Sequence, residues 1–233
     1  MKKFFILMFL ISACTFAQSK DAETILNNLI NAFNIVKDYT VEANIKIDMQ
    51  SLKVPQMRAK IFFKQPDKVH FQSEGFALLP RDGLFTSPLS FLDIKHTAIY
   101  VKDEFIDGIK TSVVKVIPLE DKGDLIITTL WVDQTKNEII KAESSTKLNG
   151  SFSLFLNYDP KIKYPLPSSM IFSFNLPKDN LLRDMNDSQF GKKRLNNSGP
   201  ITGKIYITYS HYEINIGIPD NIFEGKNKIK TKK

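Results

Sequence analysis

Residues 41–72, VEANIKIDMQSLKVPQMRAKIFFKQPDKVHFQ, contain three segments in which apolar and polar side chains alternate. In 41–49 every odd-numbered residue is apolar and every even-numbered residue is polar, and 57–64 and 69–72 repeat the pattern with Phe62 as the one apolar exception. A period of two is that of a β-strand with one buried and one wet face. Pro66-Asp67 predicts a tight turn between the second and third strands.

The segment before these strands has the period of a helix. Over residues 20–37, apolar side chains recur at three- and four-residue spacings, namely at Ala22, Ile25, Leu26, Leu29, Ile30, Phe33 and Val36. Ser19 or Asp21 can cap its start. This amphipathic helix has to pack its stripe against another element, and we expect that element to be one face of a sheet.

The rest of the chain continues as strands separated by short turns. We expect them near 97–102, 111–118, 124–133, 137–147, 151–158, 168–175 and 203–214. Such spacing indicates antiparallel meander pairing rather than parallel βαβ units. The sequence therefore predicts an α+β, mostly β fold, in which a strongly curved antiparallel sheet forms an unclosed half-barrel around a helix. We see no repeat or linker, so residues 18–225 are expected to form a single domain.

Two segments interrupt the strand pattern. Residues 75–95, GFALLPRDGLFTSPLSFLDIK, are too apolar for a solvated loop, and long apolar connections of this kind often act as lids or plugs. They could equally form one or two short helices that seal the end of the barrel. Residues 177–202 are polar and are expected to form a surface excursion.

The net charge of +7 is concentrated at the two ends of the chain. Lys2 and Lys3 lie at the N-terminus, and residues 226–233 contain five lysines, so the residues between these ends carry no net charge. A neutral body does not resemble a basic nucleic-acid-binding domain. We expect the lysine tail at 226–233 to be disordered, with contact to anionic lipid headgroups as the alternative.

Residues 1–17 have the pattern of a secretory signal peptide, with two lysines followed by an apolar run and small residues. Two processing sites compete. Thr15-Phe16-Ala17 suits signal peptidase, which would leave a soluble periplasmic protein. Ile11-Ser12-Ala13-Cys14 suits a bacterial lipobox, which would leave Cys14 lipidated. Because Cys14 is the only cysteine, the chain cannot form an internal disulfide.

Sequence motifs for catalysis are missing. His70, His96 and His211 have no companions at metal-ligand spacing, and no nucleophile elbow, phosphate-binding loop or dinucleotide fingerprint is present. Three acids in 120–124 surround Gly123 and are expected at a hairpin tip rather than in a cation site. We therefore predict no enzymatic activity, no cofactor and no metal.

Apolar side chains are in excess for a simple sheet. The chain contains 18 phenylalanines, and the strand 124–133, DLIITTLWVD, is apolar on both faces. Alternation places Leu125, Ile127 and Trp131 on one face and Ile126, Leu130 and Val132 on the other. A concave face lined in this way either packs a helix or leaves an apolar cavity. Acyl chains suit such a cavity, since each methylene removed from water contributes about 0.8 kcal/mol.

The candidate cavity-lining residues come from the strands and from the 75–95 segment. They are Ile45, Ile47, Ile61, Phe63, Phe71, Phe76, Leu79, Phe85, Phe91 and Trp131.

The order of helix, antiparallel strands, FFKQPDKVHFQ (62–72) and an apolar segment resembles the LolA-like family of periplasmic lipoprotein carriers. The closing phrase IPDNIF (218–223) is similar to that family's final turn. The resemblance implies an unclosed β-barrel with a helical lid over a hydrophobic cavity. It also implies transfer of lipoproteins from an inner-membrane transporter to an outer-membrane acceptor. The acceptor and some envelope-stress sensors share the fold.

One position departs from the family pattern. Well-studied carriers have an arginine before the proline of the second hairpin that hydrogen-bonds the lid, whereas this chain has Gln65. A glutamine amide can donate but lacks the charge and fork of a guanidinium, so the resemblance implies a weaker hold on the lid.

The sequence thus predicts an exported, non-enzymatic, monomeric periplasmic protein that sequesters lipid acyl chains, as a carrier in lipoprotein sorting. The first alternative is an outer-membrane-anchored acceptor or envelope sensor lipidated at Cys14. The second is a periplasmic hydrolase without a recognisable motif.

Overall fold

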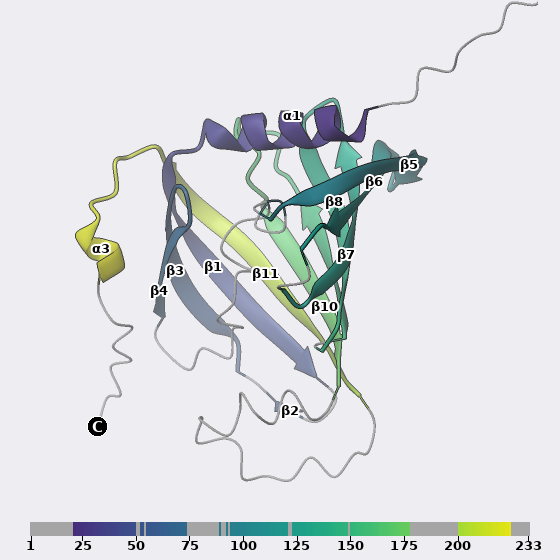
Figure 1. Cartoon of the computed structure of the whole chain (residues 1–233). Coiled ribbons are helices and arrows are strands. Elements are labelled where there is room, and N and C mark those ends of the chain that lie inside the picture. The colour runs from purple at the N-terminus through teal and green to yellow at the C-terminus, as the bar shows by residue number, and fades with distance from the viewer. Residues whose placement is uncertain are drawn as a thin grey trace, which may run out of the picture.

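The computed structural model describes residues 21–49, 52–53, 55–73, 89, 92, 94–120, 123–148, 150–177 and 200–224 (Figure 1). The expected signal peptide at 1–17, Cys14, the lysine tail and residues 178–199 lie outside these ranges. Most of the 75–95 segment also lies outside them, but Leu89 and Leu92 are described.

The predicted N-terminal helix forms as α1 (Ala22–Asn34), slightly shorter than expected at both ends. Asp21 is its N-cap, because the Asp21 carboxylate accepts hydrogen bonds from the backbone N–H groups of Glu23 and Thr24, each at 3.2 Å. The buried side chains of α1 are those of the predicted stripe: Ala22, Ile25, Leu26, Leu29 and Phe33. Figure 1 shows α1 lying across one end of the curved sheet.

The strands alternate with short turns. They are β1 (Asp38–Met49), β2 (Leu52–Lys53), β3 (Met57–Lys64), β4 (Lys68–Ser73), β5 (His96–Ile106), β6 (Ile109–Pro118), β7 (Leu125–Asp133), β8 (Glu138–Thr146), β9 (Ser151–Asn157), β10 (Ser169–Leu176) and β11 (Ile201–Ile214). A short helix, α3 (Asn221–Glu224), follows.

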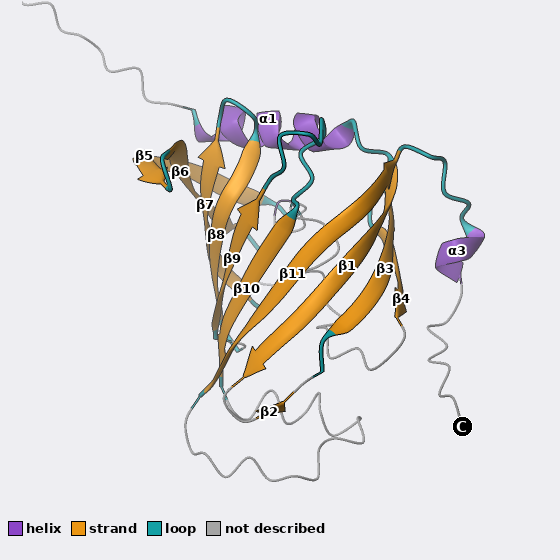
Figure 2. Cartoon of the chain, turned by 180° about the vertical axis from the view of Figure 1, so that it is seen from behind, coloured by secondary structure: helices purple, strands orange, loops and turns teal. Residues whose placement is uncertain are grey.

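All these strands belong to one antiparallel sheet with the order β4-β3-β1-β11-β10-β9-β8-β7-β6-β5, with β2 paired to β1. Strands β5 to β11 form a meander, and β11 returns to pair with β1, as Figure 2 shows from behind. The ends of the order are β4 and β5, which do not pair with each other in the described residues. The predicted mostly β fold with a curved, unclosed sheet is therefore confirmed.

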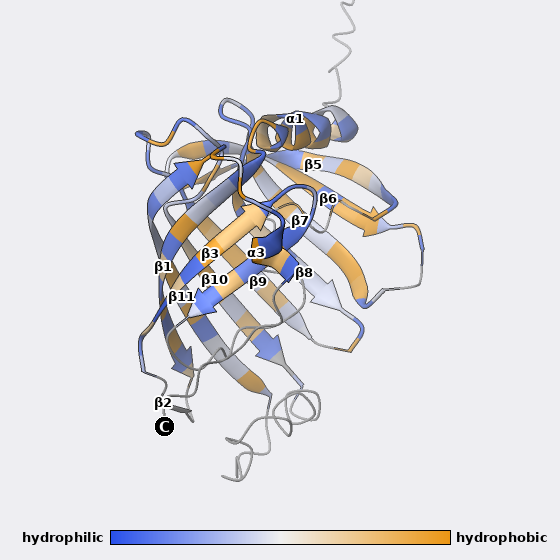
Figure 3. Ribbon diagram, turned by 90° about the vertical axis from the view of Figure 1, so that its left-hand side faces the viewer, coloured by the Kyte–Doolittle hydropathy of each residue, from blue (hydrophilic) through white to orange (hydrophobic). Residues whose placement is uncertain are grey.

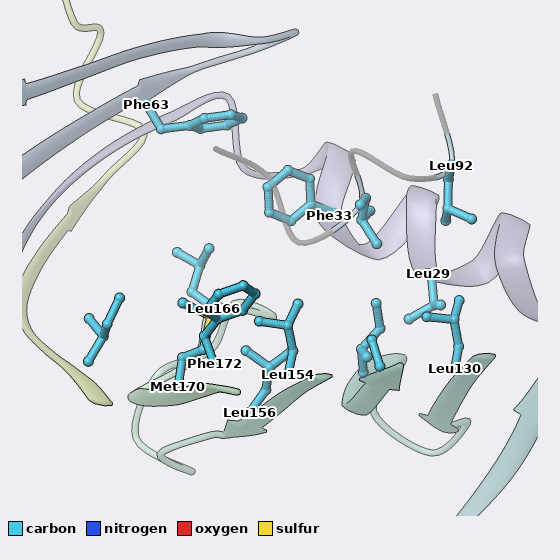
Figure 4. Close-up of a cluster of buried hydrophobic side chains, with 14 of the residues drawn as sticks. Leu29, Phe33, Phe63, Leu92, Leu130, Leu154, Leu156, Leu166, Met170 and Phe172 are labelled. Atoms are coloured by element: carbon cyan, nitrogen blue, oxygen red, sulfur yellow. The ribbon is translucent and has the colours of Figure 1, made fainter. Parts of the chain in front are cut away.

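Alternation along the strands gives the sheet an apolar concave side, and the bands of hydrophobic and hydrophilic residues are visible in Figure 3. The apolar side chains meet those of α1 in one buried cluster. Figure 4 shows its central members, which are Leu29, Phe33, Phe63, Leu92, Leu130, Leu154, Leu156, Leu166, Met170 and Phe172. Phe63 packs edge-on against Phe33, with ring centroids 5.7 Å apart, and so joins the sheet to the helix.

Strand β7 departs from simple alternation. Its pairing with β8 shifts register twice, with Ile126 as the extra residue on β7 and, opposite Trp131 and Val132, Ile140 as the extra residue on β8. Since Leu125 pairs with Thr146 and Ile127 with the adjacent Ser145, the two side chains point to opposite faces. The assignment of Leu125 and Ile127 to one face was therefore wrong.

The two edges of the sheet are covered differently. At the β4 edge, Lys64 Nζ donates to the backbone carbonyl of Ile218 at 2.9 Å and to Asp220 Oδ1 at 2.6 Å, and Lys68 Nζ lies 3.2 Å from the same oxygen. These contacts hold the segment that leads to α3 beside β4 (Figure 1). At the β5 edge, the Ala98 N–H donates to Glu23 Oε1 of α1 at 3.2 Å.

Candidate functional site

The concave side of the sheet brings together five of the predicted lining residues. Ile45, Ile47, Ile61 and Phe63 are buried in the central cluster, and Phe63 has no exposed area. Phe71 is half-buried and packs against the same cluster. All five come from β1, β3 and β4, where strand pairing aligns Ile61 with Phe71.

Four other predicted lining residues, Phe76, Leu79, Phe85 and Phe91, lie outside the described residues. Two leucines of the same segment, Leu89 and Leu92, are buried in the cluster with α1 and the strands. The Leu92 N–H donates to the Leu89 carbonyl at 2.8 Å. The segment thus places apolar side chains inside the half-barrel at these two positions.

Trp131 lies on the convex side of the sheet, because its neighbours Leu130 and Val132 both point into the cluster. Its indole N–H donates to Glu104 Oε2 at 2.9 Å, and Lys141 Nζ sits 4.3 Å from its ring centroid. The bond from Trp131, assisted by Lys102, holds the pKa of the Glu104 carboxyl below its usual value. Trp131 is therefore a residue of the outer face, and its prediction as a lining residue was wrong.

Gln65 holds the end of α1. Its side-chain amide donates to the carbonyl of Val36 at 2.7 Å and to that of Phe33 at 3.4 Å. Asn215 adds a second anchor, since its amide donates to the carbonyl of Ile35 at 3.0 Å and its oxygen accepts from the Lys37 N–H at 2.6 Å. In the described residues, Gln65 thus fixes the helix C-terminus.

A shallow recess opens between α1 and the start of β8. Its apolar wall is formed by Leu29, Phe33, Leu89, Ile139 and Pro165, and its polar rim by Asn137, Glu138 and Tyr158. Sequence reasoning missed the rim because a carboxylate at a strand start has no distinguishing pattern. The enclosed part of the recess measures about 10 Å³, which is room for about one water molecule and far below the roughly 300–1,000 Å³ of typical small-molecule sites. A lipid chain therefore needs additional space from movement of the surrounding elements.

The three histidines do not converge. The His70 ring lies 5.8 Å from the Phe62 ring, His96 Nδ1 lies 2.7 Å from the Ile94 carbonyl, and His211 Nδ1 lies 3.2 Å from Glu42 Oε2. The last contact is a histidine–carboxylate pair, but both of its side chains are largely exposed and it does not line the recess.

Within the described ranges, no group of three or more histidine, cysteine or acidic residues is placed to hold a metal ion. No helix among the residues that can be described has the length and apolar character to cross a membrane.

A curved, unclosed antiparallel sheet with an apolar concave side and a helix across one end defines the LolA-like fold, and this protein has that fold. Solved structures agree with the assignment. A LolA superfamily protein from Nitrosomonas europaea has a TM-score of 0.58 at 14% identity, over 88% of this chain and 98% of the other. No family model matches the sequence, and no curated relative matches it.

Two further solved structures have the same arrangement. A DUF1329 family protein from Desulfovibrio piger has a TM-score of 0.54 at 14% identity, over 87% of this chain and 96% of the other. A domain described as an outer membrane lipoprotein-sorting protein, from Vibrio parahaemolyticus, has a TM-score of 0.55 at 13% identity, over 87% of this chain and 97% of the other.

Proposed function

We propose that this protein is an exported, non-enzymatic carrier that binds the acyl chains of lipids or lipoproteins on the concave side of its sheet. The observation that carries the proposal is the single buried apolar cluster that the concave side of the sheet forms with α1, Leu89 and Leu92 inside an unclosed half-barrel. The name of the Vibrio parahaemolyticus domain, a lipoprotein-sorting protein, agrees with this role.

An acyl chain would bind by taking the place of the Leu89 and Leu92 side chains in the interior. Leu89 and Leu92 come from the connection between β4 and β5 and occupy the interior with α1. If they leave, the apolar area that they cover becomes available to an acyl chain. Burial of the chain, at about 0.8 kcal/mol per methylene, offsets exposure of the leucines. The paired core of β1 and β11 can remain intact during this exchange.

The proposed location is the periplasm, with residues 1–17 acting as a cleaved signal peptide and the mature protein acting as a monomer. An inner-membrane transporter and an outer-membrane acceptor are the proposed partners. The alternative of an anchored acceptor or sensor is favoured by the lipobox-like sequence that ends at Cys14. Mass spectrometry of the mature N-terminus distinguishes them, because a diacylglyceryl group on Cys14 excludes the soluble carrier.

Native mass spectrometry of protein purified from its own periplasm tests acyl binding. We expect co-purified lipid or lipoprotein, and saturable one-to-one binding of a fluorescent fatty acid after delipidation. Phe71→Ser should weaken this binding, because Phe71 packs against the interior cluster. Phe62→Ser is the matched control, since Phe62 is also half-buried but sits on the other face of β3, where its ring lies against His70. Equal effects of both substitutions, or no saturable binding, would contradict the proposal.

A further inference from the structure

The recess between α1 and β8 has two chemically different sides. Leu29, Phe33 and Leu89 form its apolar wall, and all three also belong to the central cluster. Glu138 and Tyr158 lie on its polar rim. The recess therefore shares a wall with the interior where we propose that acyl chains bind, and a chain that displaces Leu89 would pass directly beside the rim.

Of the three polar residues of the rim, Asn137, Glu138 and Tyr158, Glu138 is the one with a carboxylate. Tyr158 is already engaged, because its hydroxyl donates to the Ile139 carbonyl at 3.0 Å. Among the described residues, Glu138 has neither a hydrogen-bond partner nor an ion-pair partner. Partial burial raises the pKa of Glu138, and the nearby Asp133 adds to this while Lys136 opposes it. The carboxylate oxygens still reach solvent, but partial burial costs the ionised form hydration, and a ligand that supplies hydrogen-bond donors restores it.

We propose that this recess binds the polar end of the acyl ligand and selects a primary ammonium group, with Glu138 as its counter-ion. This inference rests on the proposed acyl binding. An ionised carboxylate only accepts hydrogen bonds, whereas an ammonium group has three donors and no acceptor, so the two are complementary. Charge-assisted N–H···O bonds are also about twice as strong as neutral ones.

Other polar ends fit the recess less well. A hydroxyl group can donate one bond to Glu138 but brings no charge, and a carboxylate would be repelled by it. Aminophospholipid headgroups and lysine side chains of acylated peptides both carry a primary ammonium group. The recess therefore predicts the same polar-end chemistry for both sources.

The test uses displacement of a fluorescent fatty acid from the delipidated full-length protein by dodecylammonium, dodecanol and dodecanoate at neutral pH. We expect dodecylammonium to bind at least about tenfold more tightly than dodecanol, a difference of about 1.4 kcal/mol. Glu138→Gln should reduce this ratio to about twofold or less, because the amide keeps the shape of the side chain but not its charge. Glu143→Gln is the control, since Glu143 lies on the same strand but pairs with Lys141 at 2.6 Å and is half-exposed.

Glu138→Lys provides a second variant, for which the preference should invert in favour of dodecanoate. Equal affinities of the wild-type protein for the three probes would overturn the inference, as would an unchanged ammonium preference in Glu138→Gln. In both cases acyl binding itself would stand. Failure of all three probes to bind would contradict the proposed function as well.

A single-chain ethanolamine phospholipid and an N-acylated lysine amide then compare the two sources. Tighter binding of either one than of its trimethylated counterpart supports the inference and identifies the source. Equal binding with and without the methyl groups would count against ammonium recognition.

Discussion

Gln65 connects the turn after β3 to two carbonyl groups, that of Phe33 in the last turn of α1 and that of Val36 just beyond the helix. Replacing it by leucine removes both donors, and we expect the free energy of unfolding to fall by about 1–2 kcal/mol. Gln65→Glu should cost more, because a carboxylate cannot donate and lies beside the negative end of the helix dipole. Chemical denaturation measures both values. Gln72→Leu on the exposed edge strand β4 is the control, and an equal loss there would contradict a specific role for Gln65.

Asp38 is a buried acid at the start of β1. Its carboxylate accepts from the backbone N–H of Ile216 at 2.8 Å and from that of Gly217 at 3.1 and 3.2 Å. Asp38→Ala leaves both N–H groups without this partner, and we expect a loss of about 2–3 kcal/mol in denaturation experiments. Asp48→Ala on the same strand removes an exposed carboxylate and should change stability by less than about 0.5 kcal/mol. Similar values for the two variants would refute the anchoring role.

Single residues show where sequence reasoning stops. Ile45, Ile61 and Phe63 were assigned to the interior by alternation alone, and they lie in the buried cluster. Trp131 was not assigned correctly, because alternation separates it from Leu130 and Val132 but does not say which of the two faces points inward. Glu138 was also missed, since its position depends on α1 and β8 meeting in space.

At the scale of elements, periodicity predicted α1 and nearly all of the strands, with bounds that differ by a few residues. The local pattern is sufficient because each strand has one buried and one wet face. It did not reveal that the segment at 215–224 would dock on β4, because that contact depends on lysines from β3 and β4 meeting Asp220. Such pairings between distant parts of the chain carry no local signal.

Docking of the C-terminal segment should depend on pH. The hydrogen bonds from Lys64 and Lys68 hold the pKa of Asp220 below its usual 3.8. Because the pKa of Asp220 is lower in the folded than in the unfolded protein, ionised Asp220 contributes stability at pH values above its unfolded pKa. This contribution is lost as the pH falls below the unfolded pKa and through the folded pKa. We expect the protection of the amides in β4 and in 218–224, relative to their intrinsic exchange rates at the same pH, to fall below pH about 4. In Asp220→Asn this protection should already be low at neutral pH. A loss of protection below pH about 4 in that variant as large as in the wild type would contradict the role of Asp220.

The molecule as a whole should be sensitive to alkali. Burial raises the pKa values of Tyr39, Tyr158, Tyr209 and Tyr212, all of which lie in or against the central cluster. Their neutral forms contribute stability that is present below the unfolded pKa of about 10 and is lost as the pH rises above it. We expect tyrosinate absorbance to appear in one step together with loss of the β-sheet circular dichroism signal. Gradual ionisation in a folded protein would contradict this.

We expect the half-barrel to open by rotation of α1 about its C-terminal end. Among the residues that the structure describes, Gln65 and Asn215 hold that end with four hydrogen bonds, whereas the N-terminal end has one bond to the sheet edge, from the Ala98 N–H to Glu23. Removing the weaker anchor should therefore ease access to the interior without unpairing β1 from β11.

Glu23→Ala removes that anchor, and we expect the association rate of a fluorescent fatty acid to rise about fivefold, corresponding to about 1 kcal/mol for one lost hydrogen bond. Glu23→Gln keeps an acceptor at the same position and should leave the rate close to that of the wild type. Stopped-flow fluorescence measures the rates, and amide exchange on ligand binding should increase at the start of α1 while remaining unchanged in β1 and β11. If Asn215→Ala accelerates association more than Glu23→Ala does, the pivot lies at the other end of the helix and the proposed direction of opening is wrong.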